Sequence, residues 1–193
     1  PSQMAVGATW NREYANQVGK VLGAELSALG FNLFLGPNLD VLETRNAEAT
    51  NSLGVHTFGG DPFWVGEMGK AFVSGLHTGS ENRILVVAQN FPGSGNSDRS
   101  PEDEVATVRK SLEQLKQIEL APFFAVTDLD KEDPSRVDAL MVSHIRYQGF
   151  QGNIRATTKP ISFDSNALQQ IMALQEFANW REAGGLIISD SLG

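Results

Sequence analysis

Polar side chains that can do chemistry follow four apolar runs of this sequence. The carboxyl ends of parallel strands meet at one edge of a sheet, and polar groups at that edge are where chemistry is usually placed. Asp190 comes directly after the run Leu186-Ile187-Ile188-Ser189, so it is a candidate catalytic carboxylate. The alternative is that it caps a following helix. The other candidates near the ends of apolar runs are Asp40, the pair Gln89-Asn90, and His144.

The elements that must position these residues alternate between helices and strands. Apolar residues at helical spacing, with Thr9, Asp61-Pro62 and Asp164 as start signals and Gly30 as a stop, predict four helices. These helices cover residues 9–29, 61–76, 103–120 and 164–183. Short apolar runs predict strands at residues 31–35, 83–88 and 139–144 and after Gly184-Gly185. Residues 121–127 fit either a helix end or a short strand, and the predicted loops are residues 42–60, 89–103 and 146–162.

This alternation indicates an α/β fold whose parallel strands are joined by right-handed crossovers. Polar groups at the ends of all four strands favour a barrel of the TIM type over a nucleotide fold with a single crevice. A complete barrel typically takes about 250 residues, whereas this chain has 193 residues. We therefore expect residues 1–193 to form a single, partial (β/α) barrel domain of about four βα units. The missing strands would be two before Pro1 and two after Gly193.

Composition argues against several classes of partner. The net charge of −8 and the pI of about 4.8 argue against nucleic-acid binding, which requires a basic face, and against an anionic membrane surface. The chain has no cysteine, which excludes disulfides and thiolate metal sites. Apolar runs are all shorter than the roughly 20 residues of a membrane span. The sequence begins at Pro1 without a visible signal peptide, and it leaves the cellular location open.

The sequence lacks complete motifs for binding nucleotides or metals. The segment 91–95 lacks the full glycine pattern of a phosphate-binding loop, and the next helix is too distant to hold a phosphate. Residues 128–139 have Asp133 and Ala139 where a calcium loop requires Gly and Glu. His56, His77 and His144 lack ligand spacing, so we predict no metal site and no cofactor. His77, near a helix end, is expected to be a surface residue or a helix C-terminal residue.

Five segments, in order and at suitable spacing, resemble one family, the N-terminal (β/α)8-barrel domain of glycoside hydrolase family 3, which contains β-glucosidases and β-N-acetylglucosaminidases. The resemblance covers nearly the whole chain and corresponds to the central portion of that domain. The segments are Gly30 to Val41, matching a Gly-x-Asn strand followed by Pro and Asp-Val; His56-Thr57-Phe58-Gly59-Gly60-Asp61-Pro62; Gln89-Asn90-Phe91-Pro92-Gly93-Ser94-Gly95, matching Lys-His-Phe-Pro-Gly-His-Gly; Met141 to His144; and Ser189-Asp190-Ser191-Leu192.

The resemblance implies hydrolysis of β-O-glycosidic bonds by a retaining mechanism. Asp190 would be the nucleophile, and the second reacting group would be an acid roughly 5–5.5 Å away. The implied substrate is a β-glucoside or a β-N-acetylglucosaminide. The implied substrate-binding residues are Asp40, His56, Gln89, Asn90 and His144.

The departures from the family pattern are equally informative. His56, Gln89 and Asn90 stand where the family has an Arg and a Lys-His pair that hold sugar hydroxyls, and Ser94 replaces a histidine. The acid/base histidine of the glucosaminidase branch has no counterpart between Asn90 and Glu104; Glu102 or Asp103 either substitutes for it or begins the next helix. We therefore expect weak or no hydrolysis by this chain, and whether it is an enzyme stays open.

A non-catalytic carbohydrate-binding module or a scaffold remnant of a hydrolase is the alternative function. Amide side chains at positions 89 and 90 can still form hydrogen bonds with sugar hydroxyls, so binding could outlast catalysis. A half-barrel also leaves two unpaired sheet edges. We therefore expect the chain to self-associate or to rearrange so that these edges are covered.

Overall fold

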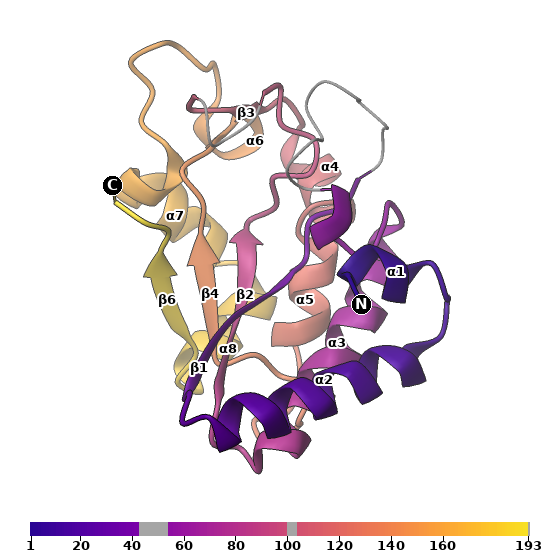
Figure 1. Ribbon diagram of the computed structural model, residues 1–193. Helices are drawn as coiled ribbons and strands as arrows, with labels where there is room; N and C mark the ends of the chain where they lie inside the picture. Colours follow the sequence, from indigo (N-terminus) through magenta and orange to yellow (C-terminus); the bar gives the residue numbers. More distant parts are fainter. Residues whose placement is uncertain (43–53, 100–103, 193) are drawn as a thin grey trace.

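Four parallel strands form the central sheet of the computed structural model, which describes residues 1–42, 54–99 and 104–192 (Figure 1). The order across the sheet is β1-β2-β4-β6, and each strand pairs in parallel with the next. The strands are β1 (Leu33–Asn38), β2 (Leu85–Phe91), β4 (Ala139–Val142) and β6 (Leu186–Ser189). A smaller parallel pair is formed by β3 (Thr107–Val108) and β5 (Arg146–Tyr147).

Helices and short 3-10 turns connect the strands. Their bounds are α1 (Gln3–Gly7), α2 (Arg12–Ala28), η1 (Gly54–His56), α3 (Pro62–Ser80), α4 (Leu112–Gln117), α5 (Ala121–Thr127), α6 (Gln148–Gln151), η2 (Ile161–Phe163), α7 (Ser165–Met172) and α8 (Gln175–Glu182). The predicted α/β fold with a parallel sheet is confirmed, and the barrel in this chain is partial. None of the helices in the described ranges is long and apolar enough to cross a membrane.

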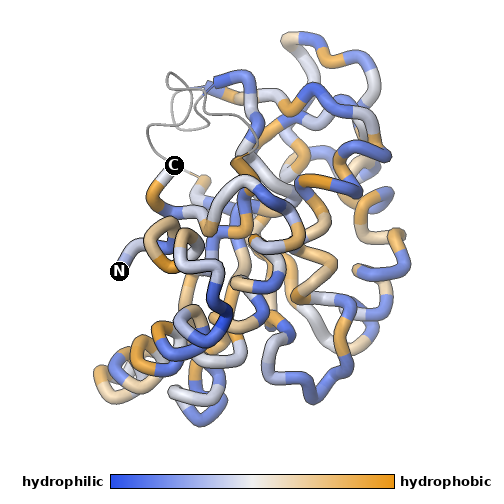
Figure 2. Tube along the Cα trace, turned by 90° about the vertical axis from the view of Figure 1, so that its right-hand side faces the viewer, coloured by the Kyte–Doolittle hydropathy of each residue, from blue (hydrophilic) through white to orange (hydrophobic). Residues whose placement is uncertain are grey.

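The two faces of the central sheet are covered unequally. One face, which carries Phe34, Val86, Leu140 and Ile187, belongs to the main core and packs against the helices. Figure 2 shows apolar residues along the central strands and hydrophilic residues in many of the outer turns. We call the opposite face the inner face; it holds a small cluster of Val87, Ala139, Met141 and Ile188. Four leucines of the inner face are about half exposed: Leu33 (46%), Leu35 (50%), Leu85 (48%) and Leu186 (51%).

Helices α2 and α3 approach each other through glycines on both helices. A Cβ atom added to Gly19 or Gly23 of α2 would lie 2.2 or 2.3 Å from a backbone oxygen of α3. In return, a Cβ added to Gly75 or Gly79 of α3 would lie 2.0 Å from a backbone oxygen of α2. Side chains at the contact set the distance between packed helices, so the absence of Cβ atoms allows the backbones to touch.

The predicted helix over residues 9–29 is the single helix α2 (Arg12–Ala28), and the short helix α1 (Gln3–Gly7) precedes it. Helix α2 begins at Arg12 with the Asn11 side chain accepting a hydrogen bond from the Glu13 N–H. The predicted cap was wrong: the Thr9 hydroxyl instead donates to the Val6 carbonyl. Gly30 does follow the helix, with a positive φ of 89°, as a C-terminal stop should.

The predicted helix over residues 103–120 was also wrong. Residues 107–108 form β3, which pairs with β5, and the helix that follows is the short α4. Ser111 begins α4 with a capping box, in which its hydroxyl accepts from the Gln114 N–H while the Gln114 side chain accepts from the Ser111 N–H. Pairing with a strand distant in sequence therefore overrides the helical spacing of the apolar residues.

Three further segments differ from expectation or settle an open alternative. Residues 121–127 form a helix, α5. The predicted helix 164–183 starts at its predicted cap, Asp164, but breaks at Leu174, which has extended backbone angles, into α7 and α8. The break directs Phe177 and Trp180 of α8 into the core, where both are buried. The predicted loop 146–162 contains β5, α6 and the start of η2.

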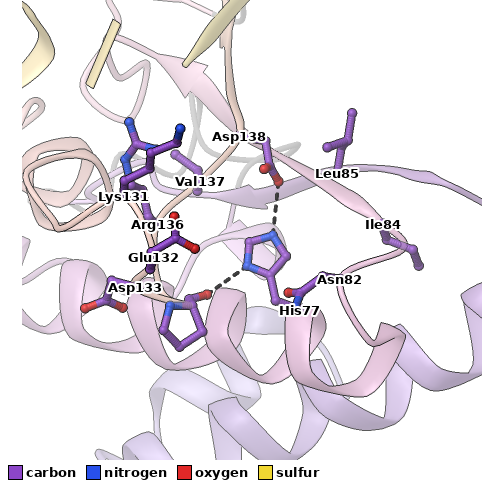
Figure 3. A pocket seen from close by; sticks show the side chains of 11 residues that line it. His77, Asn82, Ile84, Leu85, Lys131, Glu132, Asp133, Arg136, Val137 and Asp138 are labelled. Atoms are coloured by element: carbon purple, nitrogen blue, oxygen red, sulfur yellow. Dashed lines mark hydrogen bonds and ion pairs between the residues drawn. The ribbon is translucent and has the colours of Figure 1, made fainter. Parts of the chain in front are cut away.

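Of the two expectations for His77, the helix C-terminal position is confirmed and the surface position is wrong, because its exposed fraction is 7%. It lies in the last turn of α3, at the end of the sheet opposite the candidate site, beside a hollow of about 370 Å³ (Figure 3). One ring nitrogen lies 3.0 Å from the Asp138 carboxylate and the other 2.8 Å from the Pro134 carbonyl. The Asp138 carboxylate also accepts from the Val86 N–H at 2.7 Å. Because carboxylates and carbonyls accept, both contacts are hydrogen bonds when both ring nitrogens carry hydrogen, so this setting favours the imidazolium form of His77.

We expect the His77→Gln variant to lose stability in a pH-dependent way. Burial acts to lower the pKa of His77, but the hydrogen bonds to Asp138 and Pro134 and the charge of Asp138 outweigh it, and the pKa is raised. A raised folded-state pKa contributes stability that is fully present below the unfolded value of about 6.5 and is lost as pH rises through the folded value.

The expected loss is about 2 kcal/mol at pH 5.5, the scale of hydrogen bonds to charged groups. The difference in unfolding free energy between the wild type and His77→Gln should become smaller in alkaline solution. Other charged groups lining the hollow are Lys131, Glu132, Asp133 and Arg136. Urea unfolding of both proteins at several pH values measures the difference, and a difference independent of pH would contradict the assignment.

Candidate glycosidase site

The predicted site residues follow neighbouring strands that end at the same edge of the sheet. Near these ends, Asn38 of β1 is paired with Gln89 of β2, Phe91 with Val142 of β4, and Val142 with Ser189 of β6. The candidates extend from this edge in strand order: Asp40, then Gln89 and Asn90, then His144, then Asp190. The fold therefore places five of the six candidate residues at one end of the partial barrel.

Asp40 is completely buried and organises the segment that follows β2. Its carboxylate accepts hydrogen bonds from the Ser94 N–H at 2.5 Å, the Ser94 hydroxyl at 2.8 Å and the Asn90 amide at 2.8 Å. Burial raises the pKa of Asp40, while these hydrogen bonds and one with Asn38 act to lower it. Ser94, where the family has a histidine, is therefore a partner of Asp40, a role that sequence reasoning missed.

The two amides of β2 are used differently. Asn90 donates to Asp40, whereas the Gln89 amide donates to the Leu35 carbonyl of β1 at 3.3 Å. Gln89 lies on the inner face, two residues after Val87, and both amides are half-buried. Gln89 is therefore the amide of this pair that lies toward the interior of the partial barrel.

His144 and Asp190 are connected through the residue after Asp190. One ring nitrogen of His144 lies 2.8 Å from the Ser191 carbonyl and the other 2.6 Å from the Ser162 hydroxyl. Since a carbonyl accepts, the nitrogen facing Ser191 carries hydrogen, and in a neutral ring the other nitrogen accepts from Ser162. The ring also stacks on Phe163, with centroids 5.4 Å apart. His144 thus holds the chain immediately beyond the candidate nucleophile.

Asp190 is half-buried at the end of β6. Its N–H donates to the Val142 carbonyl at 3.0 Å, which continues the pairing with β4 beyond the last strand residue. One carboxylate oxygen accepts from the Ser191 N–H at 2.7 Å. The backbone is thus fixed on one side while the carboxylate keeps contact with solvent, the combination that an attacking group requires.

His56 lies apart from the other candidates. It is exposed in η1 and lines a hollow together with Gln3 of α1, Val18 of α2 and Phe34 of β1. That hollow is on the helix-covered side of the sheet, since Phe34 contacts Phe72 of α3. The described geometry therefore gives His56 a setting unlike those of Asp40 and Asn90, and its role in binding sugar stays a prediction.

A buried polar layer lies beneath the segment that follows β2, and sequence reasoning missed it as well. Glu119 is fully buried and pairs with Lys110 at 2.6 Å, and it accepts from the Asn96 amide at 3.1 Å. The Tyr147 hydroxyl donates to the Gly93 carbonyl at 2.8 Å. Burial raises the pKa of Glu119 against the opposing hydrogen bond and charge of Lys110. The only sequence signal was the run of family motif residues that this layer supports.

Two candidate acids, Glu102 and Asp103, lie outside the described residues. Among the residues that are described, no group of three or more His, Asp or Glu side chains is arranged to hold a metal ion. The chemistry of the described edge is therefore that of a half-buried carboxylate flanked by amide and imidazole groups.

Comparison with known proteins decides the family. The profile of the Glycosyl hydrolase family 3 N terminal domain matches residues 1–193. The chain belongs to glycosyl hydrolase family 3. This confirms the resemblance drawn from the motifs.

Relatives and solved structures agree with the family. The chain is 26% identical over 193 residues to a beta-hexosaminidase of Pseudomonas aeruginosa, covering 100% of this chain and 51% of that protein. It is 27% identical to a beta-hexosaminidase of Hydrogenovibrio crunogenus, covering 93% of this chain and 44% of that one. A family 3 beta-N-acetylglucosaminidase structure from Paenibacillus sp. matches with a TM-score of 0.79 at 27% identity, over 100% of this chain and 32% of that chain. This family 3 chain thus spans about half the length of the curated relatives it matches.

Proposed function

We propose that this family 3 chain contributes the nucleophile side of a retaining site for β-N-acetylglucosaminides or β-glucosides, with Asp190 as nucleophile. The observation that carries the proposal is the position of Asp190: it is a half-buried carboxylate at the end of β6, held by Val142 and adjacent to His144 through Ser191. The beta-hexosaminidase names of several relatives favour the aminosugar.

The proposed reaction has two steps. An Asp190 oxygen attacks the anomeric carbon, the bond to the leaving oxygen breaks, and that oxygen takes a proton from an acid. Water then attacks the anomeric carbon of the glycosyl ester and passes a proton to the conjugate base of that acid, which releases the sugar and restores both the carboxylate and the acid. In this proposal Gln89 and His144 bind sugar hydroxyls, and Asp40 acts by holding Asn90 and Ser94.

We expect hydrolysis by this chain to be weak or absent. General acid catalysis contributes about 10²–10⁴-fold, and the described edge has the amides of Gln89 and Asn90 where the family has a Lys-His pair. The measurement is release of the aryl group from aryl β-N-acetylglucosaminide and aryl β-glucoside, by the wild type, by Asp190→Asn and by Asp128→Asn. Asp128 is an exposed carboxylate far along the chain from the site and serves as the matched control.

Residual turnover should vanish in Asp190→Asn and persist in Asp128→Asn. A 2-deoxy-2-fluoro glycoside, which slows the second step, should leave its sugar on the peptide that contains Asp190, detectable by mass spectrometry. Turnover that survives in Asp190→Asn would show that Asp190 is not the nucleophile. High turnover by the wild type that is lost in Asp190→Asn would contradict the expectation that this chain hydrolyses glycosides weakly or not at all.

The alternative function, carbohydrate binding without catalysis, is favoured by the amides of Gln89 and Asn90. Titration calorimetry with N-acetylglucosamine and its oligomers separates the two functions. Binding by Asp190→Asn at wild-type affinity, with no turnover by either protein, would favour the binding function.

We also propose that the isolated chain self-associates through its sheet edges and inner face. In the described residues, β1 and β6 each pair on one side, and four inner-face leucines are about half exposed. Unpaired edges and large apolar patches both favour association. Sedimentation at several concentrations should show dimers or larger species, and a stable monomer throughout would contradict this proposal.

A further inference from the structure

Three aromatic rings gather on the surface outside the candidate site. The rings of Trp10 and Trp64 meet edge to face with centroids 5.3 Å apart, and those of Phe63 and Trp64 meet in the same way at 5.7 Å. Trp10 is 59% exposed and Phe63 is 66% exposed. We call these three residues the aromatic cluster. It comes from two elements, the turn after α1 and the first turn of α3.

The local backbone holds the aromatic cluster in place. Trp10 has a positive φ of 52°, which is uncommon for a bulky residue, and its N–H donates to the Gly7 carbonyl at 3.0 Å. A Cβ added to Gly7 would lie 1.8 Å from the Phe58 carbonyl oxygen, so α1 is in backbone contact with the segment before α3. The rings are therefore presented on a fixed frame and lose little freedom on binding.

A polar rim accompanies the rings. Trp10 and Trp64 line a hollow of about 140 Å³ whose other lining residues include Gly59, Gly60 and Asp61. The Asp61 carboxylate caps α3 by accepting from the Trp64 N–H at 3.0 Å, and the residue is exposed. Carboxylate and backbone groups beside aromatic rings match a ligand that carries hydroxyl donors and an apolar ring face.

The aromatic cluster lies at the same end of the sheet as the candidate nucleophile. Gly59 bridges Val41, the residue after Asp40. Val41 in turn lies against Gly95, where an added Cβ would be 2.2 Å from the Val41 carbonyl oxygen. The rim of the hollow is thus continuous with the segments that carry Asp40 and Ser94.

We propose that the aromatic cluster binds a neutral β-linked oligosaccharide, with a sugar ring against Trp10 and Phe63 and its hydroxyls donating to Asp61. The choice of ligand class rests on the proposed function, and the net charge of −8 disfavours anionic ligands. The site is separate from the nucleophile, so it holds a distant part of a glycan whose other end reaches the sheet edge.

Indole N–H signals in a nitrogen-15 NMR spectrum test this directly, because the chain has three tryptophans. Two belong to the aromatic cluster. The third, Trp180, is buried and donates its indole N–H to the Val137 carbonyl, so it is an internal reference. Titration with tri-N-acetylchitotriose at millimolar concentration should move the Trp10 and Trp64 signals and leave the Trp180 signal unchanged.

Variants separate this site from the candidate nucleophile. Asp190→Asn should leave the ligand-induced shifts of the Trp10 and Trp64 signals in place, whereas Trp10→Ala and Phe63→Ala should each weaken binding about tenfold, or about 1.4 kcal/mol. Phe31→Ala, at a 57% exposed aromatic residue before β1, is the matched control and should change nothing. Unmoved Trp10 and Trp64 signals, or unchanged affinity in both cluster variants, would overturn the proposal. A variant that lost hydrolysis but kept binding would test the proposed role of Asp190 and not that of the aromatic cluster.

Discussion

Asp40→Ala should be among the most destabilising single substitutions in this protein, with an expected loss of about 3–5 kcal/mol. That is the scale of leaving several hydrogen-bond donors without an acceptor, at about 1–3 kcal/mol for each buried group. Three donors converge on the Asp40 carboxylate: the Ser94 N–H, the Ser94 hydroxyl and the Asn90 amide. Removing the acceptor leaves the two buried Ser94 donors and the half-buried Asn90 amide without this partner.

Asp40→Asn provides the matched control. The amide oxygen can still accept from the Ser94 N–H, and the amide can donate to the Ser94 hydroxyl. Burying a neutral group also avoids the desolvation that raises the pKa of Asp40. We therefore expect a loss of about 1 kcal/mol, the scale of one imperfect hydrogen bond. Chemical unfolding of the three proteins tests this, and equal losses in both variants would show that the hydrogen-bonding shell is not what Asp40 contributes.

Gly75→Ala should separate α2 from α3 and cost about 3 kcal/mol, at the upper end of the usual range for overpacking. The added methyl group would lie 2.0 Å from the Asn16 carbonyl oxygen and 2.9 Å from the Lys20 nitrogen, both backbone atoms that cannot rotate away. The better helix propensity of alanine would offset up to about 1 kcal/mol of this.

Gly54→Ala is the control for that prediction, because a Cβ added there meets no atom within 4 Å. Thermal unfolding should show a clearly lower midpoint for Gly75→Ala and little change for Gly54→Ala. A stable Gly75→Ala protein would mean that the two helices can separate without losing their other contacts.

The glycines of α2 also explain where sequence reasoning failed for this helix. Tyr14, Val21 and Leu29 are apolar residues that recur at helical spacing in this segment, yet they are 51%, 58% and 75% exposed. The face that is buried carries Ala15, Gly19 and Gly23. Hydropathy scores a glycine as neutral, so a contact made by the absence of side chains leaves no apolar signal.

Elements with local start signals were predicted well. Asp61-Pro62 and Asp164 begin α3 and α7, because a side-chain cap and the following residues are sufficient to define a helix start. The partners of His77 were invisible by contrast, since Pro134 and Asp138 lie 57 and 61 residues away in the chain. The same holds for Ser94 and Asp40, which are 54 residues apart.

In the candidate site too, positions with a local sequence signal were predicted, and contacts between residues distant in the chain were not. Strand ends and family motifs placed Asp40, Gln89, Asn90, His144 and Asp190 on one sheet edge, as the structure does. His56 shares the motif spacing but lies on the helix-covered side of the sheet. Which hydrogen bonds each side chain makes depends on loop conformation, and the sequence carries no periodic signal for it.

The weak covering of β6 has a consequence for how long Asp190 stays in position. Within the described residues, β6 pairs with β4 alone, and both its first and last residues are exposed, whereas all four residues of β4 are buried. Segments with few buried contacts open locally at a lower free energy than the core. Amide hydrogens of β6 should therefore exchange with solvent sooner than those of β4. Each such opening displaces Asp190 and breaks the His144–Ser191 contact. Any contact that covers β6 would therefore increase the fraction of time that Asp190 is held at the end of the strand.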